Sequence, residues 1–177
     1  MKTFVISGLT SCGSSTIGKL LADKLALKYF SIGKEFKKRG EGAGETDKNI
    51  NFTKTKEAKD KNFHDYLDNL QVELAKKGGI VIDSKLGIHF LKDIADKCIW
   101  ITASFETRAK RIAKREAWNI EKARKKLKEK EELEINLFKA VYGIDYREQE
   151  KKADFVINTE EKIPEEVVNE IMVKLDL

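Results

Sequence analysis

A run of small residues near the N-terminus has the residue types and the spacing that bind phosphate. The run Gly8–Ser15 matches the phosphate-binding loop pattern G-x-x-x-x-G-K-[ST], except that Ser14 stands where the pattern has lysine. Backbone N–H groups of the segment Cys12–Ser15, where a helix is expected to begin, can bind phosphate oxygens without a side-chain cation. The hydroxyl of Ser15 is placed to bind Mg²⁺. The run therefore predicts nucleotide binding; the alternative is a tight strand-to-helix turn without a ligand.

The sequence favours neither nucleophilic nor metal chemistry on its cysteines. Cys12 would lie near a helix N-terminus, which can lower a thiol pKa, but a nucleophile also needs a base beside it. The only histidines are His64 and His89. Cys12 and Cys98 form no Cys-x-x-Cys pair, so we expect neither a zinc site nor a disulfide. Such cysteine usage is typical of a reducing compartment, and we expect a cytoplasmic protein.

Charge is dense and of both signs. The chain has 35 Lys and Arg against 30 Asp and Glu, which gives a net charge of +5. A small anionic ligand fits this balance, whereas so many acidic residues argue against nucleic acid as the main partner. No apolar run is long enough to cross a membrane, and the N-terminus has no signal-peptide core, so no membrane partner is expected. A length of 177 residues predicts one domain, 1–177, which we expect to be a monomer.

Five apolar segments that alternate with helical patterns predict an α/β fold. The expected strands are 2–7, 29–32, 80–82, 97–102 and 154–157, and the expected helices include 62–77, 120–142 and 165–175. This order predicts three layers, with a five-stranded parallel sheet flanked by helices and ligands at the carboxyl ends of the strands. Residues 40–62 show the weakest pattern of either kind and are expected to be a mobile segment, the least structured stretch of the chain. The charged stretch 121–132 is expected to be a solvated helix face.

Several segments resemble, in order, the small archaeal cytidylate (CMP) kinases of the nucleoside monophosphate kinase group. Gly13-Ser14-Ser15-Thr16 resembles the family's G-x-G-T-T-T loop, in which a hydroxyl residue can replace lysine. The segment 29–36 resembles S-A-G-x-x-F-R, and 108–116 matches the lid helix motif R-A-x-R-I-A-x-R-E. Residues 142–145 and 156–159 match Y-G-I-D and V-I-N-T. The resemblance covers nearly the whole chain and implies a P-loop kinase fold.

The resemblance also implies a reaction and a set of roles. It implies transfer of the γ-phosphoryl group of ATP to CMP or dCMP, with Mg²⁺. The donor nucleotide would be bound by Gly8, Cys12, Gly13, Ser14, Ser15 and Thr16, with Arg108 on the adenine ring and Ser15 also on the metal. Arg111 and Arg115 would close over the phosphates as part of a lid, residues 108–142. Asp83, which otherwise would cap a helix, is expected to orient a metal-bound water. The acceptor would be bound by Ser31, Lys37, Asp68 and Lys85, the last also catalytic.

The chain departs from the family pattern at several cations. Lys37 and Lys85 stand where the family has arginine, and in R-E-x-S-E-x-x-R-Y the chain has Lys130 and Leu137 but keeps Glu131 and Glu134. Lysine lacks the planar fork with which arginine binds two phosphate oxygens at once. Two alternatives therefore remain open. The chain is a P-loop kinase for another small-molecule acceptor, or it is a nucleotide-binding regulator in which catalysis has lapsed, with the lysine-rich segment 122–130 as its docking surface.

Overall fold

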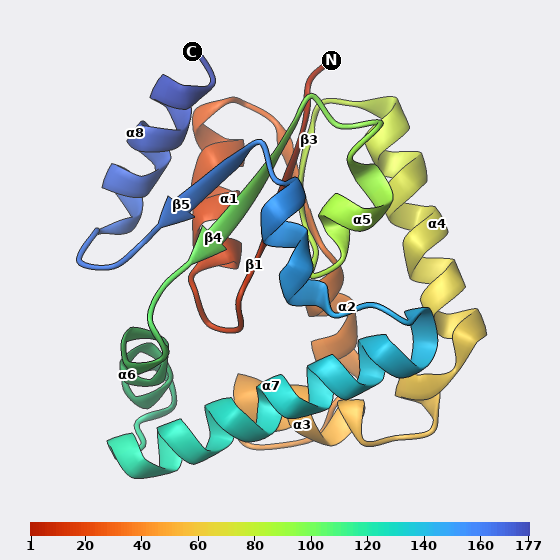
Figure 1. Cartoon of the computed structure of the whole chain (residues 1–177), viewed down its shortest axis with the longest axis vertical. Helices are drawn as coiled ribbons and strands as arrows, with labels where there is room; N and C mark the ends of the chain where they lie inside the picture. Colours follow the sequence, from red (N-terminus) through yellow and green to blue (C-terminus); the bar gives the residue numbers. More distant parts are fainter.

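A five-stranded parallel sheet forms the centre of the molecule. The structure is a computed structural model that describes all 177 residues. The strands lie in the order β2-β3-β1-β4-β5 (Figure 1). Their bounds are β1 Thr3–Gly8, β2 Lys28–Ser31, β3 Ile80–Asp83, β4 Lys97–Thr102 and β5 Phe155–Asn158. Every neighbouring pair is parallel, so all five carboxyl ends lie at one edge. The predicted fold class is confirmed.

Helices cover both faces of this sheet because its strands are apolar on both sides. Alternate residues of a strand point to opposite faces. Phe4 and Ile6 pack with α1 (Ser14–Lys24) and α8 (Pro164–Lys174), and Val5 packs in a second core with α4 (Lys61–Lys77) and α5 (Gly87–Leu91). This second core also contains Trp100 and Tyr146, both fully buried. The two cores give the three layers that the strand and helix pattern predicted.

A group of helices lies beyond the carboxyl ends of the strands (Figure 1). It consists of α2 (Ile32–Arg39), α3 (Glu45–Thr53), α6 (Phe105–Glu116) and α7 (Ile120–Tyr142). Between α6 and α7 the small side chains Ala109 and Ala123 pack with Ile112 and Leu127. A further apolar cluster joins α2, α3 and α4 to α7. Two 3₁₀ segments, η1 (Glu57–Lys59) and η2 (Tyr146–Lys152), complete the chain.

Capping residues explain where α6 and α7 begin and where α7 ends. The Ser104 hydroxyl caps α6 by accepting from the Thr107 N–H, and the Asn119 side chain caps α7 by accepting from the Lys122 N–H. At its other end α7 stops at Gly143, whose φ of 70° is left-handed and favours glycine. None of the helices carries an apolar stretch long enough to span a membrane.

The expectation that residues 40–62 are the least structured stretch is wrong, whereas the expected mobility of this segment stays a prediction. Most of this stretch forms α3 and η1. Its larger apolar side chains, Ile50 and Phe52, are buried, and so is Ala58. Because most of the remaining residues are polar, including the buried Thr46, Asn49 and Thr53, the apolar pattern of a helix was too weak to detect. Helices α2 and α5 were also missed, since each is short and begins beside a glycine.

Candidate active site

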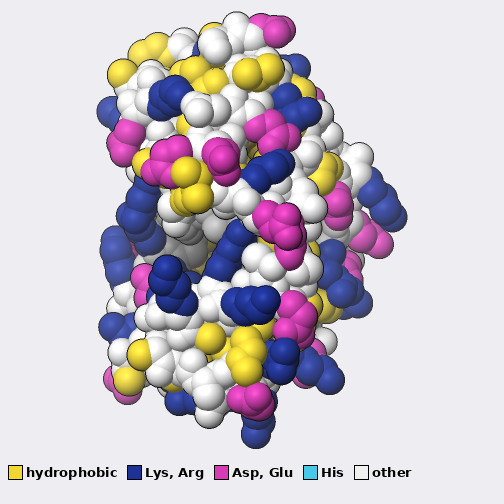
Figure 2. Space-filling model, turned by 90° about the vertical axis from the view of Figure 1, so that its left-hand side faces the viewer, with side chains coloured by type: hydrophobic (Ala, Val, Ile, Leu, Met, Phe, Trp, Pro, Cys, Tyr) yellow, Lys and Arg dark blue, Asp and Glu magenta, His cyan; other side chains and the backbone are white.

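A cleft of about 620 Å³ lies between the carboxyl ends of the strands and the helices beyond them. Figure 2 shows this face of the molecule, which is hollowed at mid-height and bordered there by Lys and Arg side chains. The volume is typical of a site for a small-molecule ligand. The lining comes from the loop after β1, the end of β3 and the helices α2, α3, α4, α6 and α7. The cleft thus lies where the fold predicts ligand binding.

The loop between β1 and α1 has the strand-loop-helix context that its sequence predicted. Gly8 ends β1 so close to β4 that a Cβ atom there would lie 2.3 Å from the carbonyl oxygen of Ile101. Gly13 is the N-cap of α1 and has a φ of 103°, a conformation that favours glycine. The N–H groups of Gly13, Ser14 and Ser15 donate to no protein oxygen, so they are available to an anion at the helix N-terminus.

The expected role of Cys12 changes in the structure. Its N–H donates to the carbonyl of Leu9, so this group is used within the loop and is not free for phosphate. Its side chain is 1% exposed, and burial raises the pKa of the Cys12 thiol. The thiol is therefore neutral at physiological pH and a poor nucleophile. The sequence likewise did not favour nucleophilic chemistry on Cys12.

Asp83 ends β3 as a buried acceptor for three hydroxyl groups. Its Oδ2 accepts from Ser15 Oγ at 2.6 Å, Tyr29 Oη at 2.9 Å and Ser31 Oγ at 3.1 Å. Burial and the carboxylate of Asp83 raise the pKa of Tyr29, which keeps this phenol a neutral donor. The alternative that Asp83 caps a helix is wrong, because Leu86 is the N-cap of α5. Ser31 was expected to line the acceptor pocket, but it is buried and lies outside the cleft lining.

The hydroxyl of Ser15 and the carboxylate of Asp83 fit a divalent cation that is bound mainly by substrate oxygens. Mg²⁺ in phosphoryl-transfer sites takes one or two protein oxygens and completes its shell with phosphates and water. No cluster of three or more acidic, His or Cys side chains with metal-binding geometry exists in this chain. The oxygen donors at the end of β3 therefore suit a metal that arrives with its nucleotide.

The three arginines of α6 lie in three different environments. Arg111 donates to the carbonyl oxygens of Cys12 and Thr159 at 2.8 Å each, which brings its guanidinium to the phosphate-binding loop. Arg115 also lines the cleft and donates to Thr46 Oγ1 at 2.6 Å. Arg108, which was expected to pack on adenine, is 5% exposed and does not line the cleft. Three bonds hold its guanidinium, to the carbonyls of Ala103 and Thr10 and to the Glu131 carboxylate.

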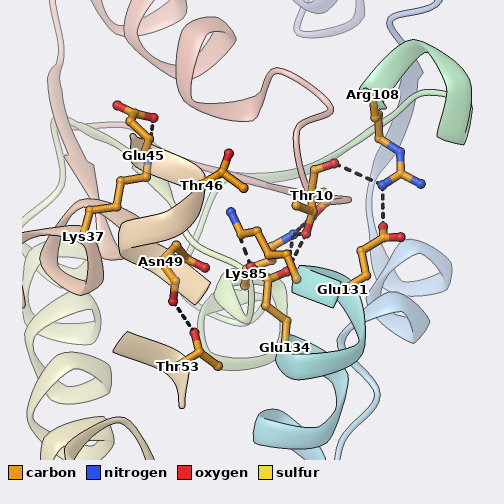
Figure 3. A network of polar contacts seen from close by, with 12 residues as sticks. Thr10, Lys37, Glu45, Thr46, Asn49, Thr53, Lys85, Arg108, Glu131 and Glu134 are labelled. Carbon is orange, nitrogen blue, oxygen red and sulfur yellow. Dashed lines mark hydrogen bonds and ion pairs between the residues drawn. The ribbon is translucent and has the colours of Figure 1, made fainter. Parts of the chain in front are cut away.

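The buried carboxylate of Glu134 on the long helix contacts Thr10 of the loop and Lys85 (Figure 3). Lys85 Nζ donates to Gly8 O and Thr10 Oγ1, both at 3.0 Å, and lies 3.4 Å from the Glu134 carboxylate. Thr10 Oγ1 also donates to Glu134. Lys130 Nζ lies 3.8 Å from the other oxygen of Glu134. Burial opposes ionisation of Glu134, but the two lysines and Thr10 outweigh it and lower its pKa. The pair Lys85 and Lys130 therefore leaves excess positive charge in the cleft.

The acceptor side of the cleft is less strongly charged. Lys37 lines it and pairs with Glu45 at 2.8 Å, across the gap between α2 and α3. Asp68 on α4 lines it as well, accepting from Tyr142 Oη at 2.5 Å and from Gln71 Nε2 at 3.0 Å. Burial raises the pKa of Asp68. The structure thus brings Lys37, Asp68 and Lys85 into one cleft with the phosphate-binding loop.

Thr10, Lys130 and Glu134 are site residues that the sequence pattern alone did not select. Lys130 and Glu134 lie one helical turn apart in the charged part of α7. The expectation that the stretch 121–132 is solvated is wrong on one face, where Ala123 and Leu127 are buried. Glu131 and Glu134 also match the family pattern. This match was the signal in the sequence that could have identified Glu134 as a site residue.

The lowered pKa of Lys130 predicts that the protein uses its substrate less well at high pH. Burial lowers its pKa, Glu134 opposes this, and the charges of Lys85, Lys37 and Arg115 on neighbouring elements lower it further, to about 8. As pH rises through that value the free protein loses a cation from the cleft, so kcat/KM with a phosphorylated substrate should fall about tenfold between pH 7 and pH 10. Lys130→Arg, which stays charged, should remove this decline. A wild-type profile that is flat to pH 10 would contradict the prediction.

Comparison with known proteins identifies relatives over nearly the whole chain. The model of the cytidylate kinase-like family matches residues 5–161. The cytidylate kinase of Ignicoccus hospitalis is 35% identical over 171 residues, 97% of each chain. That of Sulfurisphaera tokodaii is 36% identical over 166 residues, 92% of this chain and 89% of the relative. Among solved structures, the shikimate kinase of Bacteroides thetaiotaomicron covers 99% of both chains at a TM-score of 0.64 and 17% identity, which shows a shared fold. The chain belongs to the cytidylate kinase-like family.

Proposed function

We propose that this protein transfers the γ-phosphoryl group of ATP to CMP or dCMP, which gives ADP and CDP or dCDP. The observation that carries the proposal is that four positively charged side chains line the cleft between its two ends. Lys85, Lys130, Arg111 and Arg115 all line the space between the phosphate-binding loop and the residues of α2, α3 and α4. Phosphoryl transfer needs such an arrangement, because the protein mainly positions two phosphates and neutralises their charge.

On the donor side, the proposal assigns the phosphates of ATP to the loop Gly8–Ser15 and to Thr16. The free N–H groups of Gly13, Ser14 and Ser15 would donate to phosphate oxygens at the N-terminus of α1. Arg111, already at the loop, would supply the positive charge that Ser14 does not. Mg²⁺, when bound, neutralises charge on the transferred phosphates. Ser15 would be its protein ligand, and Asp83 would orient a water in its shell.

On the acceptor side, the proposal assigns the phosphate of CMP to Lys85, Lys130 and Lys37, with Arg115 closing from the lid. Asp68 would accept a hydrogen bond from the nucleoside, and its contact with Tyr142 would fix the direction of its carboxylate. Both ends of the cleft are built from one chain, so we propose a monomer. The two cysteines are free thiols, which fits the cytoplasm as its compartment.

The acceptor is tested by offering CMP, dCMP, UMP, AMP and GMP separately with Mg-ATP and measuring kcat/KM for diphosphate formation. We expect CMP or dCMP to exceed the purine monophosphates by at least about a hundredfold, since a wrong base leaves buried polar groups unpaired. A preference for AMP or GMP would contradict this acceptor while leaving the kinase assignment intact. Omission of Mg²⁺ should abolish the reaction with every acceptor.

A further inference from the structure

A hydrogen-bonded ring joins the end of α6 to the start of α3. Thr46 donates to Glu116 Oε1 twice, from its backbone N at 3.0 Å and from Oγ1 at 2.8 Å. Arg115 closes the ring, because one of its terminal nitrogens donates to Thr46 Oγ1 at 2.6 Å and its Nε donates to Glu116 Oε1 at 3.0 Å. We call these three residues, Thr46, Arg115 and Glu116, the clasp.

The Thr46 and Glu116 side chains of the clasp are buried and fit closely, whereas Arg115 is half-exposed. Thr46 is 0% exposed, and the side chain of Glu116 is 6% exposed. A Cβ atom on Gly44, just before α3, would lie 1.9 Å from Glu116 Oε2, so the carboxylate packs directly against the Gly44 backbone. Burial opposes ionisation of Glu116, but the bonds from Thr46 and Arg115 outweigh it and lower its pKa. The carboxylate is therefore charged at physiological pH.

The helices that the clasp joins both face the cleft. Glu45, Asn49 and Thr53 of α3 line it on the acceptor side, and Arg115 lines it from α6. A guanidinium has five N–H donors, and the clasp uses Nε and one terminal nitrogen. The other terminal nitrogen of Arg115 has no protein partner and remains available to an anion. The clasp thus fixes the direction of the Arg115 guanidinium relative to α3, the helix that lines the acceptor side of the cleft.

We propose that Thr46 and Glu116 are positioning residues for Arg115, whose guanidinium they aim at the reacting phosphates. This inference rests on the proposed function. Without the ring, the side chain of Arg115, which is 40% exposed, gains rotamer freedom that must be lost again in each catalytic cycle.

Two other ion pairs connect α3 and its end to α7, and the more exposed of them, Lys54–Glu129, provides a control. Lys54 pairs with Glu129 at 2.6 Å, and Lys126 pairs with Asp47 at 3.1 Å. Neither pair touches Arg115, and exposed pairs of this kind contribute little. Lys54→Met should therefore remove a contact that holds the end of α3 against α7, without touching Arg115, while leaving kcat and KM within about twofold of wild type.

The test is a double-mutant cycle between Thr46→Val and Arg115→Met. Valine keeps the shape of threonine but removes the hydroxyl that both partners use. We expect Thr46→Val to lower kcat/KM for CMP about tenfold in the wild-type background and less than about twofold in the Arg115→Met background. Thr46→Ser, which keeps the hydroxyl, should restore the wild-type value within about threefold. A tenfold loss in both backgrounds would overturn the inference, because Thr46 would then act independently of Arg115.

Hydrogen exchange separates this inference from the proposed function. In the nucleotide-free protein, Glu116→Gln should speed exchange at Thr46 and the first turn of α3 at least about tenfold, with α4 unchanged as an internal reference. Equal exchange in both proteins would show that the ring does not hold α3. If wild type forms no diphosphate from any monophosphate, the proposed function fails and the positioning role fails with it. If CDP forms but the cycle shows no coupling, only the positioning role fails.

Discussion

Replacing Gly13 with valine is expected to abolish ATP binding, with Kd raised at least about a hundredfold. Gly13 has a φ of 103° at the N-cap of α1, a conformation that a β-branched residue adopts only under strain. The nearest atom to an added Cβ is Arg111 Nη1 at 3.9 Å, so the side chain would project into space beside the loop and meet the incoming phosphates. Isothermal titration calorimetry of wild type and variant with Mg-ATP measures the loss directly.

Gly143→Val is the matched control for this substitution. Gly143 is also left-handed, with a φ of 70°, and has no neighbour within 4 Å of an added Cβ. It ends α7 and does not line the cleft. The variant should therefore lose stability through the same backbone strain but bind Mg-ATP with wild-type affinity. Equal ATP affinity in Gly13→Val and wild type would show that the loop does not bind the donor phosphates.

Lys85→Met is expected to lower kcat/KM for CMP about a hundredfold or more, which corresponds to about 2.7 kcal/mol of transition-state stabilisation. The Lys85 ammonium lies at the start of the phosphate-binding loop and is held there by Gly8, Thr10 and Glu134. Methionine keeps the aliphatic chain but removes the charge that the acceptor phosphate would need. ATP affinity should change much less, because the free N–H groups of the loop are unaltered. Steady-state kinetics with each substrate varied in turn separates the two effects.

A second variant separates the lost charge from the cost of an unpaired carboxylate. Lys85→Met leaves Glu134 buried with Lys130 at 3.8 Å and Thr10 as its remaining partners. Lys85→Met combined with Glu134→Gln removes that carboxylate charge, so it should recover thermal stability but not turnover. Recovery of wild-type turnover in the double variant would mean that Lys85 only compensates Glu134. Unchanged kcat/KM in Lys85→Met alone would remove Lys85 from the proposed mechanism.

The sheet and the phosphate-binding loop could be predicted because each depends on residues close together in the sequence. The strand 97–102 was predicted with its observed bounds, since a continuous apolar run between polar residues indicates a buried parallel strand. The spacing of Gly8 and Gly13 predicted the loop. In the structure a Cβ atom on Gly8 would clash with the backbone of β4, and Gly13 has a positive φ that favours glycine.

The helices beyond the strands were harder to predict because their contacts join residues distant in the sequence. α3 is polar at most positions, and its burial depends on α7, which lies more than 60 residues further along. The spacing of Arg108, Arg111 and Arg115 placed them on one helix but did not reveal that Thr10 and Glu131 bind the first of them. The pairing of Lys85 with Glu134 likewise depends on the approach of α7 to the end of β3.

The most direct test of phosphoryl transfer follows the labelled γ-phosphate of ATP in the presence of wild-type protein, Mg²⁺ and CMP. We predict that the label appears in CDP, at a turnover of about 1 s⁻¹ or above, the low end for kinases. Such a rate would also eliminate a regulator in which catalysis has lapsed. The contradicting result is label that stays in ATP or is released as inorganic phosphate at the same rate with and without CMP, because the cleft would then bind a nucleotide without transferring its phosphoryl group to CMP.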